Sequence, residues 1–354
     1  MKFIEESQEL AVRDASQKLV TVIIPNFNAA DTLDRAVRSV LDQSLAGIEI
    51  HIVDDASTDE SWALISDLWR RHANVRASRF AENRGRAFVA NYATERSRAT
   101  WVAILDADDW YEPTRLEAVI AAADALGVEM GTDNQFIIDP GNGQTVGTAL
   151  PVRGERLLLD LDCYQANSDA TRSFDVGMFK PVFRRAFIEA KGIEYYVPAR
   201  RGQDYYVLLA FFAAGGRAVI VDTPLYSYVQ PFGSISRQWS SAGRKRYPFE
   251  AMKQINDHFV MHYADQFTPY QRARLIARGQ QFDTVAALHQ IREAVADQDY
   301  TRAGKRLMMG FPSLWWRLGG YMLRRILTKA SRSRDATPAA IRRLRSNMSE
   351  SACG

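Results

Sequence analysis

Short apolar runs alternate with amphipathic segments over residues 19–105, and this alternation restricts the possible folds more than any other feature of the sequence. Between the runs, apolar residues recur at helical spacing, as Leu33, Val37 and Val40 do. The runs themselves are partly β-branched, which is typical of buried strands, and they lie at 19–24, 48–53, 75–80 and 101–105. This β-α-β-α-β-α-β order predicts a parallel sheet with helices on both faces.

Carboxylates follow two of the predicted strands at the point where each strand ends. Asp54 and Asp55 follow the second, and Asp106, Asp108 and Asp109 follow the fourth. The carboxyl ends of parallel strands meet at one edge of a sheet, where α/β proteins bind their ligands. Asp106 and Asp108 are spaced to offer two oxygen ligands to Mg²⁺ or Mn²⁺, which would suit a substrate that carries phosphate.

Each acidic pair also has an interpretation without a ligand. An isolated Asp-x-Asp is usually an acidic turn that ends a strand. Asp54 and Asp55 could form a solvated turn that caps the next helix, and Asp59 could equally be a cap or turn residue.

Two common phosphate-binding motifs are absent from the sequence. Pro25-Asn26-Phe27-Asn28 follows the first strand in place of Gly-x-Gly-x-x-Gly, which disfavours a dehydrogenase. No Gly-x-x-x-x-Gly-Lys-Ser/Thr occurs, which argues against a P-loop. A bound cation is therefore the expected means of holding a phosphorylated substrate.

Composition limits the compartment and the partners. The net charge of +3 does not predict a nucleic-acid partner. Cys163 and Cys353 lie far apart, as in a protein of a reducing compartment. Residues 1–18 are polar and lack the apolar core of a signal peptide, and no apolar run is long enough to span a membrane. We expect a cytoplasmic protein.

Four motifs, in this order and at these spacings, resemble the family 2 glycosyltransferases over roughly residues 19–240. They are Val22-Ile23-Ile24-Pro25 with Asn28, Val53-Asp54-Asp55 with Ser57 and Asp59, Asn83-x-Gly85 with Asn91, and Leu105-Asp106-Ala107-Asp108-Asp109. The resemblance implies an α/β protein of the GT-A fold, with a doubly wound, mostly parallel sheet and a C-terminal helical extension.

The resemblance also implies roles for single residues. Pro25 and Asn28 would line the nucleotide site. Asp55 would accept the pyrimidine N–H of a UDP-type donor, with Asp54 beside it. Asn83 and Gly85 would belong to the same donor-binding region, and Asp106 and Asp108 would hold a divalent cation on the diphosphate, Asp108 being the more direct ligand.

A separate candidate for catalysis is Asp204, in the first turn of a predicted helix. A carboxylate there could simply favour the helix N-terminus. In the family this site is Glu-Asp, and the Asp removes the proton of the acceptor hydroxyl, as inverting transfer requires. Here Gln203 replaces the Glu, and the loss of its negative charge would affect the acceptor side of the site rather than the chemistry of transfer. The basic segment 179–185 also resembles the family, either as a substrate contact or as a solvated turn.

These features predict an inverting, metal-dependent glycosyltransferase. It would move one sugar from a nucleoside diphosphate sugar, expected to be a UDP-sugar, to a hydroxyl of a glycan or lipid-linked acceptor in polysaccharide biosynthesis. A non-catalytic nucleotide-sugar-binding protein is an alternative, because the family's Glu at 203 and a His before Ser234 are missing. A sugar nucleotidyltransferase is disfavoured, because no glycine-rich basic loop follows the first strand.

The remaining chain is expected to be organised around this catalytic domain. Residues 1–18 would form an N-terminal tail, 241–330 a helical region and 331–354 a disordered tail rich in Ser, Arg and Ala. Within the helical region, 313–330 is basic and amphipathic, so it could contact a membrane surface peripherally or dock as a helix. His258 and His262 are expected to be surface or packing residues rather than Zn ligands.

Overall fold

The computed structural model describes residues 7–10, 18–150, 152, 156–167, 179–199, 202–229 and 249–309. The chain forms two compact units. The first comprises Met1–Leu161 and Gly177–Gln238, and the second comprises Asp162–Val176 and Trp239–Gly354.

Four parallel strands form one half of the sheet in the first unit, in the order β4-β3-β2-β5. Their apolar side chains are buried, with Val22, Ile24, Ile50 and Ile52 fully shielded from solvent. The parallel sheet predicted from the apolar runs is therefore confirmed. The strands are β2 (Val20–Asn26), β3 (Ile48–Asp54), β4 (Val75–Phe80) and β5 (Trp101–Ile104).

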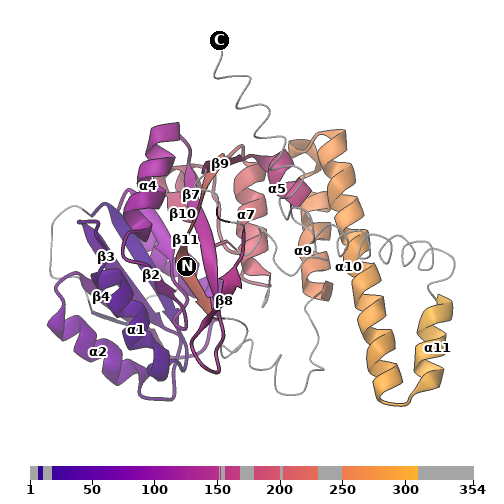
Figure 1. The fold of residues 1–354 in the computed structure, drawn as a ribbon, viewed down its shortest axis with the longest axis horizontal. Coiled ribbons are helices and arrows are strands. Elements are labelled where there is room, and N and C mark those ends of the chain that lie inside the picture. Colours follow the sequence, from indigo (N-terminus) through magenta and orange to yellow (C-terminus); the bar gives the residue numbers. More distant parts are fainter. Residues whose placement is uncertain are drawn as a thin grey trace, which may run out of the picture. The chain divides into compact units, whose positions relative to one another are not determined.

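Helices connect these strands and cover the sheet, as Figure 1 shows. They are α1 (Ala30–Leu41), α2 (Ser61–Arg71) and α3 (Arg86–Arg96). The residues predicted to face the core from α1, Leu33, Val37 and Val40, are buried. α2 packs against β3 and β4, while α3 packs against β2 and β3.

The other half of the sheet is mixed. β10 (Val182–Arg184) lies antiparallel between β5 and β7 (Met130–Ile138), and β11 (Ala218–Val229) runs parallel to β7. Beyond β7 the chain turns back, and β8 pairs antiparallel with β7. The further antiparallel strands are β1 (Ser7–Leu10), β6 (Trp110–Tyr111), β8 (Thr145–Thr148) and β9 (Arg156–Leu159).

Three more helices belong to the first unit: α4 (Arg115–Leu126), α6 (Arg185–Ala190) and α7 (Gln203–Ala213). α4 crosses β7 at Gly131, where an added Cβ would lie 2.6 Å from Val119 Cγ1 and 2.7 Å from the Val119 carbonyl oxygen. This close approach requires glycine. α7 is apolar on most of its surface and buries Leu209 and Phe211, so Asp204 is fixed at the end of a well-packed helix.

The second unit is helical in its described part. α10 packs against α9 and α11 around Ile255, Phe259, Leu275 and Phe282. The rings of His258 and His262 stack at 4.4 Å. The helices are α5 (Leu161–Asn167, whose first residue belongs to the first unit), α9 (Phe249–His262), α10 (Pro269–Ala296) and α11 (Tyr300–Met309), with the 3₁₀ turn η2 (Ala264–Gln266).

Two expectations concern segments that lie outside the described residues. These are the basic amphipathic segment 313–330 and the tail 331–354 that was expected to be disordered. Among the helices that are described, none is both long enough and apolar enough to cross a bilayer.

Candidate active site

The predicted donor-site residues gather at the carboxyl edge of the parallel strands. Asn26, the last residue of β2, pairs in register with Asp54, the last residue of β3. Pro25 lies beside Val53 in the same ladder and is half-buried. The motifs that follow these two strands are therefore neighbours in space, as the predicted sheet required.

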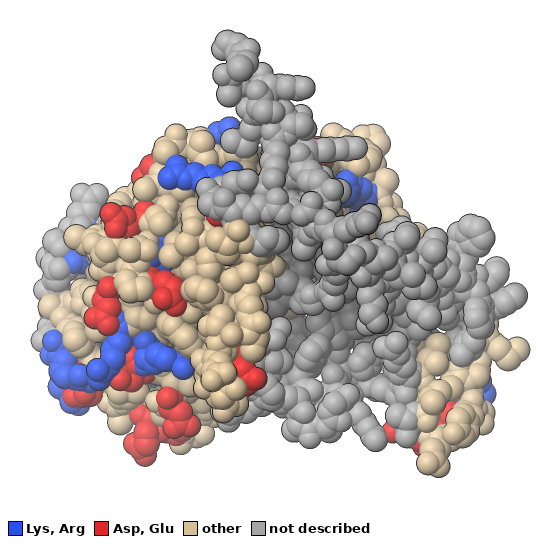
Figure 2. Space-filling view, in the orientation of Figure 1, with Lys and Arg blue, Asp and Glu red and all other residues tan. Residues whose placement is uncertain are grey.

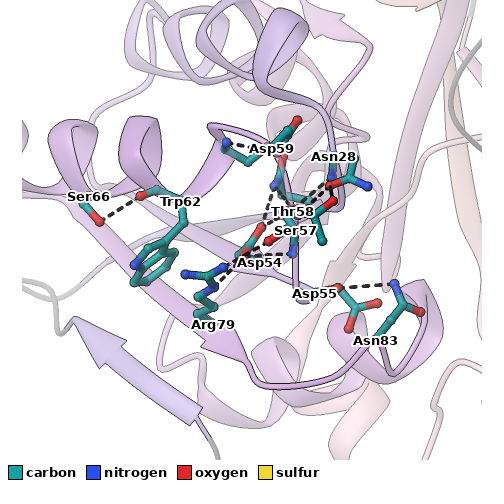
Figure 3. A network of polar contacts seen from close by, with 12 residues as sticks. Asn28, Asp54, Asp55, Ser57, Thr58, Asp59, Trp62, Ser66, Arg79 and Asn83 are labelled. Carbon is teal, nitrogen blue, oxygen red and sulfur yellow. Dashed lines mark hydrogen bonds and ion pairs between the residues drawn. The ribbon is translucent and has the colours of Figure 1, made fainter.

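Asp54 holds the loop after β3 from the inside, as Figure 3 shows. Its side chain is fully buried. Asp54 Oδ1 accepts a hydrogen bond of 2.8 Å from Asn26 Nδ2, and Oδ2 lies 3.2 Å from Arg79 Nε. The backbone N–H of Ser57 donates to Oδ2 at 3.2 Å. Asp54 thus fixes the loop through protein groups, and its predicted contact with a donor stays a prediction.

Asn28 and Asp59 join the loops after β2 and β3 (Figure 3). Asn28 has φ +50°, and its Oδ1 accepts a 2.8 Å hydrogen bond from the N–H of Thr58. The carboxylate of Asp59 accepts from the N–H groups of Ala30 and Ser61, the first residues of α1 and α2. Burial opposes ionisation of Asp59, but these hydrogen bonds outweigh it and lower its pKa. Asp59 therefore binds the first N–H group of each of two helices.

Asp55 connects the end of β3 to the start of α3. Its two carboxylate oxygens accept hydrogen bonds from the N–H groups of Arg84 (2.7 Å) and Gly85 (2.8 Å). Asn83 Nδ2 donates to the Asp55 carbonyl at 3.2 Å. Gly85, with φ +90°, is the residue before the first turn of α3. The structure thus brings Asp55, Asn83 and Gly85 together, as predicted.

Asp106 and Asp204 lie at one place and share two cationic partners. Arg86 donates from Nε to Asp106 (2.8 Å) and from Nη1 to Asp204 (2.9 Å). Lys180 Nζ lies 2.7 Å from Asp106 and 3.0 Å from Asp204. We call these four residues the charge quartet. Its carboxylates are each 23% exposed, whereas Arg86 is 16% and Lys180 6% exposed, so the acids face solvent more than the bases do.

Electrostatics distinguish the acids of this loop. Burial disfavours the charge on Asp106, but Arg86 and Lys180 more than compensate and hold its pKa below the ordinary value. Burial, and then the charge of Asp106, raises the pKa of Asp108. Burial and both neighbouring acids also raise the pKa of Asp109. The carboxyl group of Asp108 is therefore harder to ionise than that of Asp106, and a cation beside it would favour its charged form.

Several contacts hold the loop that carries Asp106 and Asp108. Tyr226 Oη donates to Asp109 at 2.6 Å and accepts from the Asp106 N–H at 3.4 Å. The N–H of Val229 donates to Asp109 at 2.8 Å. Arg35 donates to the Asp108 carbonyl at 2.7 Å. The end of β11 therefore fixes this loop.

Gln203 has a role that explains why the residue is an amide. Its side chain is buried, and Nε2 donates a 2.6 Å hydrogen bond to the carbonyl of Ala199. A glutamate carboxylate could not donate there. Nearby, Asn91 and Tyr195 exchange two hydrogen bonds of 2.8 Å, which fix the segment before α7 to α3.

Arg86 belongs to this site although its position in the sequence did not predict it. It is the first residue of α3, where the helix dipole disfavours a cation. A basic residue in that position is a weak signal that an acidic partner lies nearby. Neither partner is close to it in the sequence, so the pairing depends on the tertiary fold.

The site fits a divalent cation in part. Among the described residues, no three or more His, Cys, Asp or Glu side chains are placed to hold a metal ion. Mg²⁺ is commonly held by one or two carboxylates together with substrate phosphates, and Asp108 and Asp106 provide that number. Asp108 fits this role, whereas both oxygens of Asp106 are bound by Arg86 and Lys180.

Comparison with known proteins identifies the family. A sequence profile described as glycosyl transferase family 2 matches residues 21–189. Over these residues the chain belongs to glycosyl transferase family 2. The family 2 region includes every predicted donor-site residue, whereas Asp204 lies beyond the matched range.

Two similar proteins come from Rhizobium meliloti (strain 1021). Succinoglycan biosynthesis protein ExoO is 33% identical over 220 residues, which are 62% of either chain. Succinoglycan biosynthesis protein ExoU is 32% identical over 231 residues, or 64% of this chain and 66% of that protein. The matched part spans less than two thirds of each relative.

The fold of this family 2 protein resembles a solved structure, that of S. aureus TarS 1-349 in complex with UDP-GlcNAc. The TM-score is 0.54 at 16% identity, covering 80% of this chain and 89% of TarS 1-349. The predicted α/β, GT-A-like fold is thereby confirmed, with a sheet that is more mixed than expected.

Proposed function

We propose that the protein is a glycosyltransferase that moves one sugar from a nucleoside diphosphate sugar, a UDP-sugar, to a hydroxyl of a glycan or lipid-linked acceptor. Membership of family 2 and the two relatives named for succinoglycan biosynthesis support this activity and a place in exopolysaccharide assembly. The observation that carries the proposal is the convergence of Asp106 and Asp204, from distant parts of the chain, on the same pair of cations.

In this proposal the two halves of the site act on opposite sides of the transferred sugar. Asp204 accepts the proton of the attacking hydroxyl, and the sugar is transferred by a single displacement that inverts its anomeric centre. Asp55, Pro25 and Asn28 bind the nucleotide of the donor. Asp54 supports this binding by fixing the loop, and Asn83 and Gly85 support it by fixing the Asp55 carboxylate.

The proposal includes Mg²⁺ or Mn²⁺ at Asp108, with Asp106 as the second candidate ligand. When bound, such a cation neutralises the charge that develops on the leaving diphosphate. Burial and the neighbouring charge of Asp106 raise the pKa of Asp108. A bound cation would stabilise its charged form. We place the protein in the cytoplasm, with peripheral contact to the membrane face where a lipid-linked acceptor would be presented.

The Asp204→Asn variant tests the proposal. We expect it to bind UDP in the presence of Mn²⁺ like the unaltered chain, and to lose transfer by about 100-fold or more, because the general base is removed. Calorimetry measures UDP binding, and release of UDP from a panel of UDP-sugars with acceptor measures transfer. Asp124→Asn, on the exposed side of an ion pair with Arg184, is the matched control.

Near-normal transfer by Asp204→Asn would refute its role as the base. If the unaltered chain bound UDP but neither transferred nor hydrolysed any UDP-sugar with Mn²⁺, the non-catalytic binding protein would be the correct alternative.

A further inference from the structure

The predicted cation ligand Asp106 already has two internal cations as partners. Lys180 Nζ lies 2.7 Å from Oδ2 and Arg86 Nε lies 2.8 Å from Oδ1. Both bases are less exposed than the carboxylate they bind. They therefore hold Asp106 from the interior of the protein.

Lys180 is fixed in this position by its backbone. The Lys180 carbonyl accepts hydrogen bonds from Arg115 Nη2 at 2.7 Å and Thr132 Oγ1 at 3.3 Å. Arg115 is itself fully buried and ion-paired with Asp133. The residue comes just before β10, which is hydrogen-bonded on both sides. The ammonium is thus preorganised against Asp106 rather than carried by a mobile surface side chain.

A divalent ion bound to Asp106 Oδ2 would lie within about 5 Å of Lys180 Nζ, because Nζ is 2.7 Å from that oxygen and carboxylate–Mg²⁺ distances are about 2.1 Å. Like charges at that separation repel strongly where water is scarce. Lys180 and the metal ion are consequently alternatives for one carboxylate oxygen. The carboxylate of Asp108, two residues away in the same loop, takes part in none of the four ion pairs that Arg86 and Lys180 make with Asp106 and Asp204.

We propose that Lys180 is a built-in competitor of the divalent cation for Asp106, so that the donor-free protein binds the metal ion weakly and mainly through Asp108. This inference rests on the cation of the proposed function. Lys180 Nζ also lies 3.0 Å from Asp204, the carboxylate proposed as the base. Lys180 is accordingly a positioning residue for both halves of the site.

The test is calorimetric titration of MnCl₂ alone into the full chain. Lys180→Met keeps the length of the side chain and removes its charge, so we expect Mn²⁺ to bind about fivefold more tightly or better. Lys180→Arg keeps the charge and should stay within about twofold of the unaltered chain. Lys191→Met makes the same chemical change at an exposed position after α6 and should have no effect.

A second substitution identifies the carboxylate involved. Adding Asp106→Asn to Lys180→Met should abolish the gain in Mn²⁺ affinity, because the released oxygen is no longer charged. Equal or weaker Mn²⁺ binding by folded Lys180→Met would overturn the proposal, as would a gain that survives Asp106→Asn.

Lys180→Gln provides an independent variant if circular dichroism shows that Lys180→Met is unfolded. It also removes the charge beside Asp106 Oδ2 and should tighten Mn²⁺ binding, and the absence of any gain would overturn the proposal. The titration contains no sugar donor, so absence of glycosyl transfer would contradict the proposed function without changing this result.

Discussion

Asp54 and Asp55 are adjacent in the sequence but differ in what their carboxylates do. Asp54 is fully buried against Asn26, Ser57 and Arg79, whereas Asp55 binds the N–H groups that begin α3. Asp54 is the last residue of β3, whereas Asp55 begins the loop that follows, so the two carboxylates meet different partners. One fixes a loop, and the other connects that loop to the next helix.

Replacing Asp54 should therefore reduce stability. We expect Asp54→Ala to lower the free energy of unfolding by about 3 kcal/mol, because several buried donors lose their acceptor. Urea denaturation measures this loss. Asp67→Ala removes exposed ion pairs with Arg70 and Arg71 within α2 and should cost less than about 1 kcal/mol. Equal effects of the two substitutions would contradict the internal role of Asp54.

His51 predicts a pH dependence of stability. It is fully buried on β3, and burial followed by the charge of Arg96 lowers its pKa from 6.5 to about 3. The unfolded chain takes up a proton below pH 6.5 that the folded protein does not, so stability falls as the pH falls from about 6.5 toward 3. Between pH 7 and pH 5 we expect a loss of about 2 kcal/mol from this group.

The His51→Gln variant isolates that contribution. Urea denaturation at pH 5 and pH 7 should show a smaller difference between the two pH values in the variant than in the unaltered chain. The comparison uses the pH difference rather than absolute stability, because the substitution also disturbs the contact between His51 Nε2 and Ser78 Oγ. An unchanged difference would show that His51 is protonated in the folded state.

At the scale of elements, α4 and β7 are packed too closely for any side chain at Gly131. Gly131→Ala should cost about 2 kcal/mol, because the nearest atoms include the backbone oxygen of Val119, which cannot move alone. Gly304→Ala in α11 is the control, since nothing lies within 4 Å of its added Cβ. Thermal unfolding measures both, and tolerance of Gly131→Ala would mean that α4 can shift away from the sheet.

Elements that depend on local pattern were predictable from the sequence, and those that depend on long-range pairing were not. β2, β3 and β5 are apolar runs of the length expected for buried strands. β10 has only three residues and ends at Arg184, so its short run gave no strand signal, and it exists because β5 and β7 offer it partners on both sides. β1, in the polar N-terminal segment, likewise depends on pairing with β4.

The residues of the candidate site likewise differ in how far the sequence alone could predict them. The acids at strand ends could be located from the sequence, because each follows its strand directly. The charge quartet could not, since Arg86 and Lys180 are separated from each other and from Asp204 by long stretches of chain. The ion pairs of Asp106 with Arg86 and Lys180 make Asp108 the favoured metal ligand of the two acids. These ion pairs form only when the chain is folded.

For the whole molecule, every residue of the candidate site belongs to the first compact unit. On the face drawn in Figure 2, basic and acidic side chains are interspersed over the described surface, in keeping with the small net charge. Long-range attraction for nucleic acid is therefore not expected from this face, and recognition of a donor would depend on local contacts at the carboxyl edge of the sheet.

Ligand binding should slow amide hydrogen exchange in the first unit and not in the second. With UDP and Mn²⁺ added to the full chain, we expect slower amide hydrogen exchange at the ends of β2 and β3 and in the first turn of α3, with no change in α10. Mass spectrometry of exchanged peptides measures this. Protection confined to α10 would place the nucleotide outside the candidate site.

The hydrogen bond from Gln203 to the carbonyl of Ala199 restricts which side chains position 203 can carry. The contact is buried and needs a donor, which the amide supplies. A glutamate of the same size would set two acceptors against each other. The substitution that looks most conservative at this position is therefore an unfavourable one.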